Sequence, residues 1–310
     1  MVAPGKVTLI GTGVIGRAWA VVFARAGHEV HLFDSDPEML GKAGPAVADS
    51  IDLLAAETLI ADSAEAKKRV ITGSLRQALD DTSYVQESVT ENVGVKRAVF
   101  QELDRLAPPS AILASSASAI PGSEFMDVGG RVRCLVAHPV SPPSLVPLVE
   151  LVPTPWTDPA VVTRTLELLQ AAGQSPVTLK REIEGFVLNR LQAAVISEAM
   201  NLVGEGVISP DDLDKTMRDG LGLRWTFMGP FETMDLNAED GIGGYLRRYA
   251  KTFETICRDL KVLEPWQAEA ISTVESERRR LLPAEDLGER RRWRDQRLTA
   301  LLKLRRADNR

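Results

Sequence analysis

The chain has few of the residues that build metal centres and disulfide frameworks. Its 310 residues include 2 cysteines and 3 histidines. Cys134 and Cys257 do not have the spacing of a metal site or of a disulfide framework. We therefore expect no metal. Unpaired cysteines are typical of a reducing compartment, so the sequence predicts a cytoplasmic protein.

Long apolar runs and an excess of basic charge are also missing. No run approaches the about 20 apolar residues of a transmembrane helix, and the N-terminus shows no signal-peptide pattern. The formal net charge is −6, which disfavours a nucleic-acid partner. With 44% hydrophobic and 26% charged residues, the composition is that of a globular protein of about two domains. We expect neither a membrane nor a nucleic acid as partner.

What the chain does have is a glycine-rich turn between an apolar run and a helical pattern. Residues 7–10 predict a buried strand, and the apolar spacing over 19–26 predicts a helix. Between them, Gly11 permits a tight turn, Gly13 lets the backbone approach a pyrophosphate, and Gly16 lets helix and strand pack closely. The helix N-terminus adds unpaired N–H groups. The pattern predicts a dinucleotide site, and the competing interpretation is an ordinary glycine-rich turn.

A carboxylate stands at the end of the next predicted strand. Residues 29–33 form a second apolar run, and Asp34 follows it. Asp34 would accept hydrogen bonds from the adenosine ribose and would repel the 2′-phosphate of NADP. No arginine at positions 35–40 offsets this repulsion. The predicted cofactor is therefore NAD.

The predicted elements divide the chain near residue 184. In residues 1–184, apolar strands alternate with helices, which predicts a Rossmann-type, doubly wound and mostly parallel sheet. Residues 185–310 have a helical pattern throughout, which predicts an all-helical C-terminal domain. The sequence thus predicts an α/β fold in two domains.

Several details of this organisation are specific enough to be tested. The helical region 36–69 is expected to be interrupted near Gly44–Pro45. Residues 186–204 are apolar nearly all round, which predicts a helix buried among other helices. A helix that begins at Ser209 is expected to end at Gly220. The arginine-rich tail is expected to pack, through its leucines, on its own domain.

His138 is the histidine best placed for catalysis. It follows the predicted strand 132–137 and precedes a proline, so it should lie at an edge of the sheet. Glu150 stands inside the apolar segment 148–152, where a carboxylate is costly to bury unless it is paired. If the two strands are neighbours, Glu150 can hold one imidazole nitrogen and leave the other free to take a proton. The alternative is a structural histidine and an unrelated glutamate.

Two polar residues are candidates for binding a substrate hydroxyl. Ser118 follows a predicted strand, and a role in a turn or helix cap is equally compatible with its position. Asn189 lies in the first turn of the apolar helix, where it could equally make a hydrogen bond that serves packing alone. Both alternatives remain open from the residues themselves.

Motifs along nearly the whole chain resemble one enzyme superfamily. The matching segments are GTGVIGRAW, SSASAI, VAHPVSPP, PLVELVP, EGFVLNRLQAAVISEA, SPDDLD and GLGLRWTFMGPFETM. They are similar to the 3-hydroxyacyl-CoA dehydrogenase superfamily, and most closely to its L-gulonate 3-dehydrogenase and lambda-crystallin branch.

The resemblance implies roles for particular residues. It implies a catalytic pair of His138 and Glu150, with Ser118 and Asn189 holding the reacting hydroxyl. It also implies a homodimer joined through the helical domain, which would serve substrate binding as well. The NAD contacts that it implies are Val14, Ile15, Asp34, Glu91 and Lys96.

Two positions depart from the family pattern. Ser141 stands three residues after the histidine, where many members have asparagine, and Ser116-Ala117-Ser118 replaces an Asn-Thr-Ser turn. Between 36 and 64 the only lysine is Lys42, against six acidic residues, which disfavours coenzyme A and favours a small free acid. Arg224 is a candidate for binding its carboxylate or, alternatively, a dimer contact.

Three functions remain in competition. The first is NAD-dependent oxidation of a small 3-hydroxy acid, with L-gulonate, which would become 3-dehydro-L-gulonate, as the first choice. The second is oxidation of a 3-hydroxyacyl-CoA or of carnitine, whose cation would require aromatic residues such as Trp225 and Phe227. The third is a non-catalytic NADH-binding protein of the crystallin kind, for which the intact set of predicted catalytic residues is unnecessary.

Overall fold

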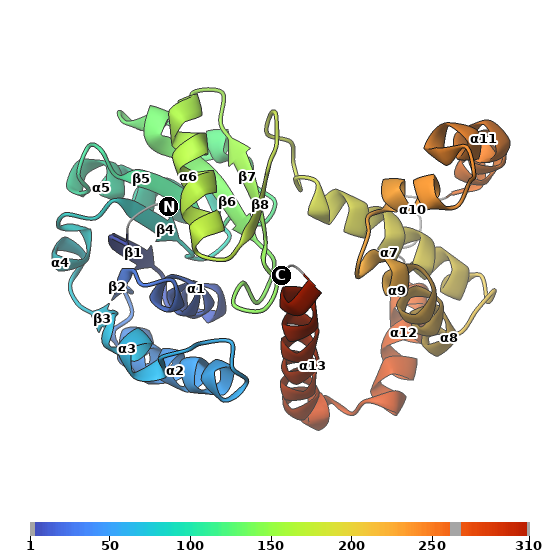
Figure 1. Cartoon of the computed structure of the whole chain (residues 1–310), viewed down its shortest axis with the longest axis horizontal. Coiled ribbons are helices and arrows are strands. Elements are labelled where there is room, and N and C mark those ends of the chain that lie inside the picture. Colours follow the sequence, from blue (N-terminus) through green and yellow to red (C-terminus); the bar gives the residue numbers. More distant parts are fainter. Residues whose placement is uncertain (1–3, 261–267, 309–310) are drawn as a thin grey trace. The chain divides into compact units, whose positions relative to one another are not determined.

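The computed structural model describes residues 4–260 and 268–308 (Figure 1). The chain forms two compact units. One comprises residues 1–189 and 292–310 and is named the sheet unit, and the other comprises residues 190–291 and is named the helical unit. The chain thus leaves the sheet unit once and returns to it at its C-terminal end.

The sheet unit is built on one sheet, which has eight strands in the described part of the chain, in the order β3-β2-β1-β4-β5-β6-β7-β8. Neighbouring strands are parallel except β6 and β7, which are antiparallel. The strands are β1 Lys6–Ile10, β2 Glu29–Phe33, β3 Val70–Thr72, β4 Tyr84–Glu87, β5 Ile112–Ser115, β6 Cys134–Pro139, β7 Leu148–Pro153 and β8 Ser175–Thr178. This order confirms the predicted doubly wound, mostly parallel sheet.

Helices begin in the sheet unit where capping side chains are available. Asp36, Asn92 and Asp158 each accept a backbone N–H at the start of α2, α5 and α6, as N-cap residues do. The helices of this part are α1 Val14–Arg25, α2 Pro37–Ala56, α3 Ser63–Lys68, α4 Leu75–Leu79, α5 Val93–Leu106 and α6 Pro159–Ala171.

Alternate strand residues face two separate apolar clusters. In β4, Tyr84 belongs to one cluster and Val85 to the other, and in β6 Leu135 and Val136 divide in the same way. Because successive side chains of a strand point to opposite faces, the clusters lie on the two faces of the sheet. Helices α1, α2 and α6 cover the first face, whereas α4 and α5 cover the second (Figure 1).

The prediction of a break near Gly44–Pro45 is wrong. Helix α2 continues through Pro45, and the interruption comes instead at 57–62, where Thr58 has a φ of 61°. Pro45 lies on the exposed side of the helix, whereas Val47 and Ile51 are fully buried on the other. Packing of the buried face outweighs the hydrogen bond that proline cannot make.

The helical unit consists of short and long helices. They are α7 Leu188–Gly204, α8 Pro210–Lys215, the π-helix Thr216–Leu221, α9 Gly222–Trp225, α10 Pro230–Leu236, α11 Gly241–Asp259 and α12 Ala268–Leu281. The prediction that Gly220 ends a helix is wrong, because the π-helical turn carries the backbone hydrogen bonds past it into α9. No helix in the described residues is long and apolar enough to cross a membrane.

Helix α7 is much less buried than its sequence predicts. Of its side chains, only Ser197 and Val203 are buried, whereas Leu191 is 62% exposed and Val195 and Ile196 are each 37% exposed. The prediction that this helix is buried among other helices is therefore wrong within the single chain. The other described residues leave these apolar side chains of α7 exposed.

The last helix, α13 (Leu287–Asp308), returns to the sheet unit. Leu298 and Leu302 pack against the core on the α1 and α2 side of the sheet, and Thr299 is buried. Lys303 forms an ion pair with Glu57 of α2. The prediction that the tail packs on the C-terminal domain is therefore wrong, because the tail packs on the sheet unit.

Candidate active site

The glycine turn between β1 and α1 has the backbone that a dinucleotide needs. Gly11 has a φ of +90°, and a Cβ there would lie 2.7 Å from the carbonyl oxygen of Ser88. A Cβ on Gly16 would lie 1.9 Å from the carbonyl oxygen of Gly11. Around Gly13 no atom lies within 4 Å of such a Cβ, so this stretch of backbone is open to a ligand. The backbone at each glycine is thus compatible with the role that the sequence predicts for it.

The first residues of α1 complete this cradle. The side chain of Val14 is 65% exposed, whereas that of Ile15 packs against the core, and no side chain caps the helix. The first backbone N–H groups of the helix are thus left for an anion. Pyrophosphate is the group that such a turn accepts.

Asp34 is held at the glycine turn by Thr12. Its Oδ2 accepts hydrogen bonds from the backbone N–H of Thr12, at 2.6 Å, and from the Thr12 hydroxyl, at 2.8 Å. The carboxylate therefore lies at the carboxyl end of β2, beside the pyrophosphate cradle, as ribose recognition requires. Together the turn and this carboxylate fit NAD.

His138 and Glu150 face each other across the antiparallel strands β6 and β7. They are direct partners in the strand register, and Nδ1 of His138 lies 2.9 Å from Oε2 of Glu150. Both side chains are buried, with 5% and 1% of their surfaces exposed. The predicted pair required the two strands to be neighbours, and β6 and β7 are neighbours in the sheet.

The turn before α7 holds the second oxygen of Glu150. Its Oε1 accepts the backbone N–H groups of Val187, at 2.9 Å, and Leu188, at 3.0 Å. Burial alone would raise the pKa of this carboxyl, but the hydrogen bonds from His138 and from the two backbone N–H groups lower the pKa below its usual value. Glu150 is therefore ionised beside the imidazole at neutral pH.

This arrangement fixes the chemistry of the imidazole. A carboxylate at Nδ1 keeps the proton on that nitrogen and leaves the lone pair on Nε2. No residue in 4–260 or 268–308 makes a hydrogen bond to Nε2 of His138. The side chain is therefore oriented to accept a proton from a ligand.

Sequence reasoning missed Phe186, which shapes this site. Gly185 and Phe186 both have positive φ, 73° and 51°, and this unusual pair of residues turns the chain into α7. The fully buried Phe186 ring lies 5.5 Å from the His138 ring. The glycine before an aromatic residue at the helix entry was the available signal, since a left-handed turn there favours glycine.

Ser118 and Asn189 are in contact, and their roles in binding a substrate hydroxyl stay predictions. The Asn189 side chain donates a hydrogen bond of 2.6 Å to the carbonyl oxygen of Ser118. Ser118 itself is exposed, and its backbone N–H donates to Oε1 of Glu91 at 2.7 Å. Asn189 directly follows Val187 and Leu188, whose backbone N–H groups bind Glu150. The same short turn therefore contacts both Glu150 and Ser118.

Lys96 supports this region from inside the protein. Its ammonium is 1% exposed and lies 2.9 Å from Oε1 of the fully buried Glu87 and 3.4 Å from Oε2 of Glu91. Glu91, with 39% of its side chain exposed, lies between this buried ion pair and the Ser118 turn. The NAD contact predicted for Lys96 would therefore act through Glu91.

The remaining predicted site residue belongs to the helical unit. Arg224 lies in α9 with its side chain exposed, and its role in binding a carboxylate stays a prediction. Among the described residues, no group of three or more His, Cys, Asp or Glu side chains could hold a metal ion.

The fold and the cradle define a class: NAD-binding proteins with a Rossmann-type sheet followed by a helical domain. Residues 6–183 match the family described as 3-hydroxyacyl-CoA dehydrogenase, NAD binding domain, and residues 185–276 match its C-terminal domain. The chain belongs to the 3-hydroxyacyl-CoA dehydrogenase family.

Individual relatives cover most of the chain. A lambda-crystallin homolog from Bos taurus is 46% identical over 97% of this chain and 96% of its own length. An L-carnitine dehydrogenase from Streptomyces griseus is 35% identical over 76% of this chain and 70% of its own length. The crystal structure of an NAD-dependent 5-formyl-3-hydroxy-2-methylpyridine 4-carboxylic acid 5-dehydrogenase superposes with a TM-score of 0.84 at 25% identity, covering 97% of this chain and 98% of that one.

Proposed function

We propose that this protein oxidises the 3-hydroxyl of a small hydroxy acid, with L-gulonate as the first candidate and 3-dehydro-L-gulonate as its product. The observation that carries the proposal is the buried hydrogen bond between His138 and Glu150 on a sheet that also carries the NAD cradle. A paired imidazole is a suitable general base for an alcohol.

The residues of the site have different roles in such an oxidation. The Ser118 hydroxyl and the Asn189 amide bind the substrate oxygen and orient it. Nε2 of His138 takes the hydroxyl proton, and Glu150 stabilises the imidazolium that forms. Bound NAD would supply the hydride acceptor for the carbinol hydrogen, so that loss of this hydride and of the hydroxyl proton to His138 would leave a ketone.

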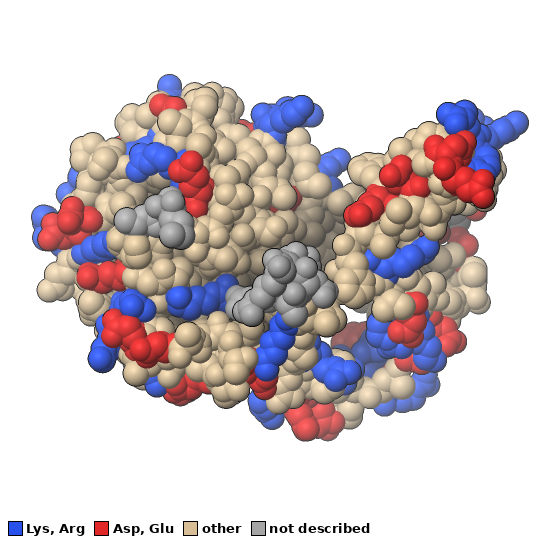
Figure 2. Space-filling view, viewed as in Figure 1, with Lys and Arg blue, Asp and Glu red and all other residues tan. Residues whose placement is uncertain are grey.

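The lysines near α2 favour a free acid over a coenzyme A thioester. Lys42, Lys67 and Lys303 each pair with an acidic residue of this helix, and so are engaged rather than free for phosphate groups. On the face drawn in Figure 2, acidic and basic side chains are interspersed, without a basic patch. A nucleotide carrier with several phosphates would need such a patch.

Carnitine is the second candidate, because two of the relatives are L-carnitine dehydrogenases. Its quaternary ammonium would need aromatic faces. Trp225 and Phe227, which are 40% and 61% exposed in the helical unit, are the aromatic side chains that could supply them. A non-catalytic NADH-binding role is the third candidate, favoured by the similarity to lambda-crystallins and disfavoured by the intact His138–Glu150 pair.

We also propose that the helical unit joins two copies in a homodimer. It exposes an unusual number of large apolar side chains, including Leu191 at 62%, Phe227 at 61%, Phe231 at 73% and Leu236 at 66%. Exposed apolar surface of this kind is typical of a protein–protein interface. A second copy would cover the faces of α7 that the single chain leaves open.

A substrate panel tests the function. Formation of NADH is followed with L-gulonate, L-carnitine and 3-hydroxybutyryl-CoA at equal concentrations, with the free acid 3-hydroxybutyrate as a further member. We expect the highest kcat/KM with a free hydroxy acid. Turnover of the thioester alone would reject the proposed substrate class, and NADH binding without any turnover would favour the non-catalytic role.

A further inference from the structure

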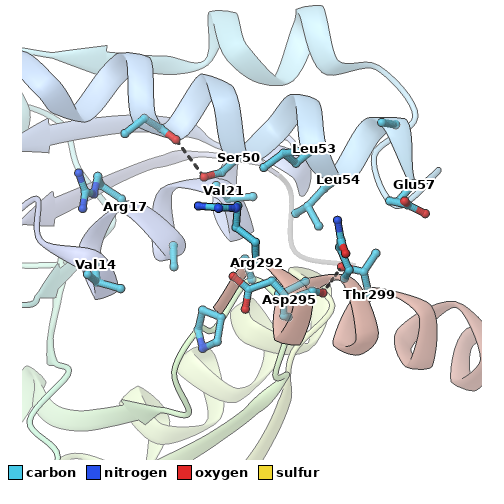
Figure 3. A pocket seen from close by; sticks show the side chains of 17 residues that line it. Val14, Arg17, Val21, Ser50, Leu53, Leu54, Glu57, Arg292, Asp295 and Thr299 are labelled. Atoms are coloured by element: carbon cyan, nitrogen blue, oxygen red, sulfur yellow. Dashed lines mark hydrogen bonds between the residues drawn. The ribbon is translucent and has the colours of Figure 1, made fainter. Parts of the chain in front are cut away.

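A pocket of about 490 Å³ lies in the sheet unit beside the glycine turn (Figure 3). Its walls come from the start of α1, the second half of α2, the loop at 142–145 and the C-terminal helix α13. This volume suits a small organic ligand. Val14 connects the pocket with the cofactor cradle, and the loop at 142–145 continues the strand that carries His138.

Two guanidinium groups line this pocket without an acidic partner. Arg17 is partly buried in α1, and Arg292 is exposed on α13. Neither side chain has a hydrogen bond or ion pair within residues 4–260 and 268–308. Figure 3 shows Arg292 extending from α13 toward α1 and α2.

The acidic groups in the same walls are already neutralised. Glu57 pairs with Lys303, and Asp295 lies 2.7 Å from the guanidinium of Arg294, which is not a wall residue. The charges left for a ligand are therefore those of the two arginines. An anion is the ligand that such a pocket attracts.

The rest of the lining is of mixed polarity. Val21, Leu54 and Leu145 form a buried apolar surface, whereas Ser50 and Gln296 supply polar groups. A ligand that matches these walls has one anionic end and a short body that carries both carbon and hydroxyl groups. Hydroxy acids have this composition.

We propose that Arg17 and Arg292 bind the carboxylate of the substrate, so that this pocket selects free hydroxy acids against esters and thioesters. The inference rests on the proposed function, because the carboxylate that it assigns to this pocket is that of the proposed substrate. It also gives α13 a role, since this helix contributes one of the two guanidinium groups. Arginine forms paired hydrogen bonds with a carboxylate, which an uncharged ester cannot match.

Kinetics with matched acids and esters test this pocket. KM and kcat are measured for L-gulonate, for 3-hydroxybutyrate and for the methyl ester of each, in the wild type, Arg17→Gln and Arg292→Gln. Each substitution should raise KM for the acids by about ten- to hundredfold, because a hydrogen bond to a charged group is lost. It should leave kcat and the ester kinetics nearly unchanged.

Arg291→Gln is the matched control, because Arg291 is exposed on the same helix and does not line the pocket. Arg224→Gln tests the alternative arginine in the helical unit. Wild-type KM values in Arg17→Gln and Arg292→Gln, or an increase in Arg224→Gln alone, would overturn the proposal while leaving the oxidation itself intact.

Calorimetry distinguishes a wrong assignment of the pocket from a wrong assignment of the reaction. L-gulonate and 3-hydroxybutyrate are titrated into the protein saturated with NADH. If neither acid is oxidised but one binds, and its binding is weakened in Arg17→Gln and Arg292→Gln, the pocket stands and the proposed reaction does not. Absence of binding by both acids would overturn the pocket as well.

Discussion

The two units of this protein differ in how far their apolar side chains are buried. In the sheet unit, two clusters of fully buried side chains fill both faces of the sheet. In the described part of the helical unit, Val203 and Pro210 are the buried apolar side chains, and long apolar side chains lie exposed on several helices. The sheet unit is thus complete in one chain, whereas the helical unit is built to be covered by something else.

The same contrast holds for polar groups. The carboxylate of Glu150 has three hydrogen-bond donors, and Lys96 has two acidic partners, although both of these side chains are buried. In the helical unit the ion pairs lie on the surface, as between Arg248 and Asp240. Buried and satisfied polar groups thus mark the part of the molecule where we propose that the reaction takes place.

The largest expected effect belongs to the buried pair. His138→Gln should reduce kcat for the hydroxy acid by about 10³-fold, because it removes the general base but keeps a polar side chain in the strand. NADH binding, followed by its fluorescence, should be unchanged. A loss of less than tenfold in kcat would show that proton removal does not depend on this imidazole.

Glu150→Gln should have the next largest effect, on the order of 10²-fold in kcat, because the imidazolium loses its counter-charge. It should also change acid stability. The carboxyl pKa is lowered in the folded state from its usual value of 4.5, so the ionised group stabilises the fold above that pH, and the contribution is lost as the pH falls through the lowered pKa.

Urea unfolding from pH 7 down to pH 3 tests whether the ionised Glu150 side chain stabilises the fold. The wild type should lose its stability advantage over Glu150→Gln as the pH falls below about 4.5. An advantage that stays constant over this range would mean that the hydrogen bonds from His138 and the α7 turn do not favour the ionised form.

A charge on the open face of α7 should affect assembly more than folding. Leu191→Asp is expected to convert a dimer into a monomer in sedimentation velocity, because it places a carboxylate in an apolar interface. Val132→Asp, at a 54% exposed position of the sheet unit, is the matched control and should keep the mass of the wild type. If Leu191→Asp and the wild type sediment alike, the helical unit does not form the proposed interface.

The smallest effect is expected where α13 meets α2 at the surface. Lys303→Ala removes the ion pair with Glu57, whose side chain is 52% exposed. Exposed pairs contribute about 0–1 kcal/mol, so the midpoint of thermal unfolding should fall by no more than a few degrees. A much larger fall would mean that the docking of α13 depends on this contact rather than on Leu298 and Leu302.

Local sequence patterns were sufficient to predict the strands and the glycine turn of the sheet unit. The glycine turn, the carboxylate at Asp34 and the alternating strands follow from spacing and residue type, which depend on neighbours close in the chain. The pairing of His138 with Glu150 was also foreseen, because only 12 residues separate them and the strands that carry them are strongly apolar. A helix cap or a strand period is a local property, and such properties can be predicted from sequence.

Contacts between distant segments had to come from the tertiary structure. Nothing near residue 298 indicates that the last helix returns to α1 and α2, or that Arg292 and Arg17 line one pocket. The apolar pattern of α7 was clear, but whether its faces are buried depends on surfaces that other elements provide. The sequence by itself determined the sheet, the cofactor cradle and the catalytic pair, whereas long-range packing alone decided where the chain's end lies and which charges it brings together.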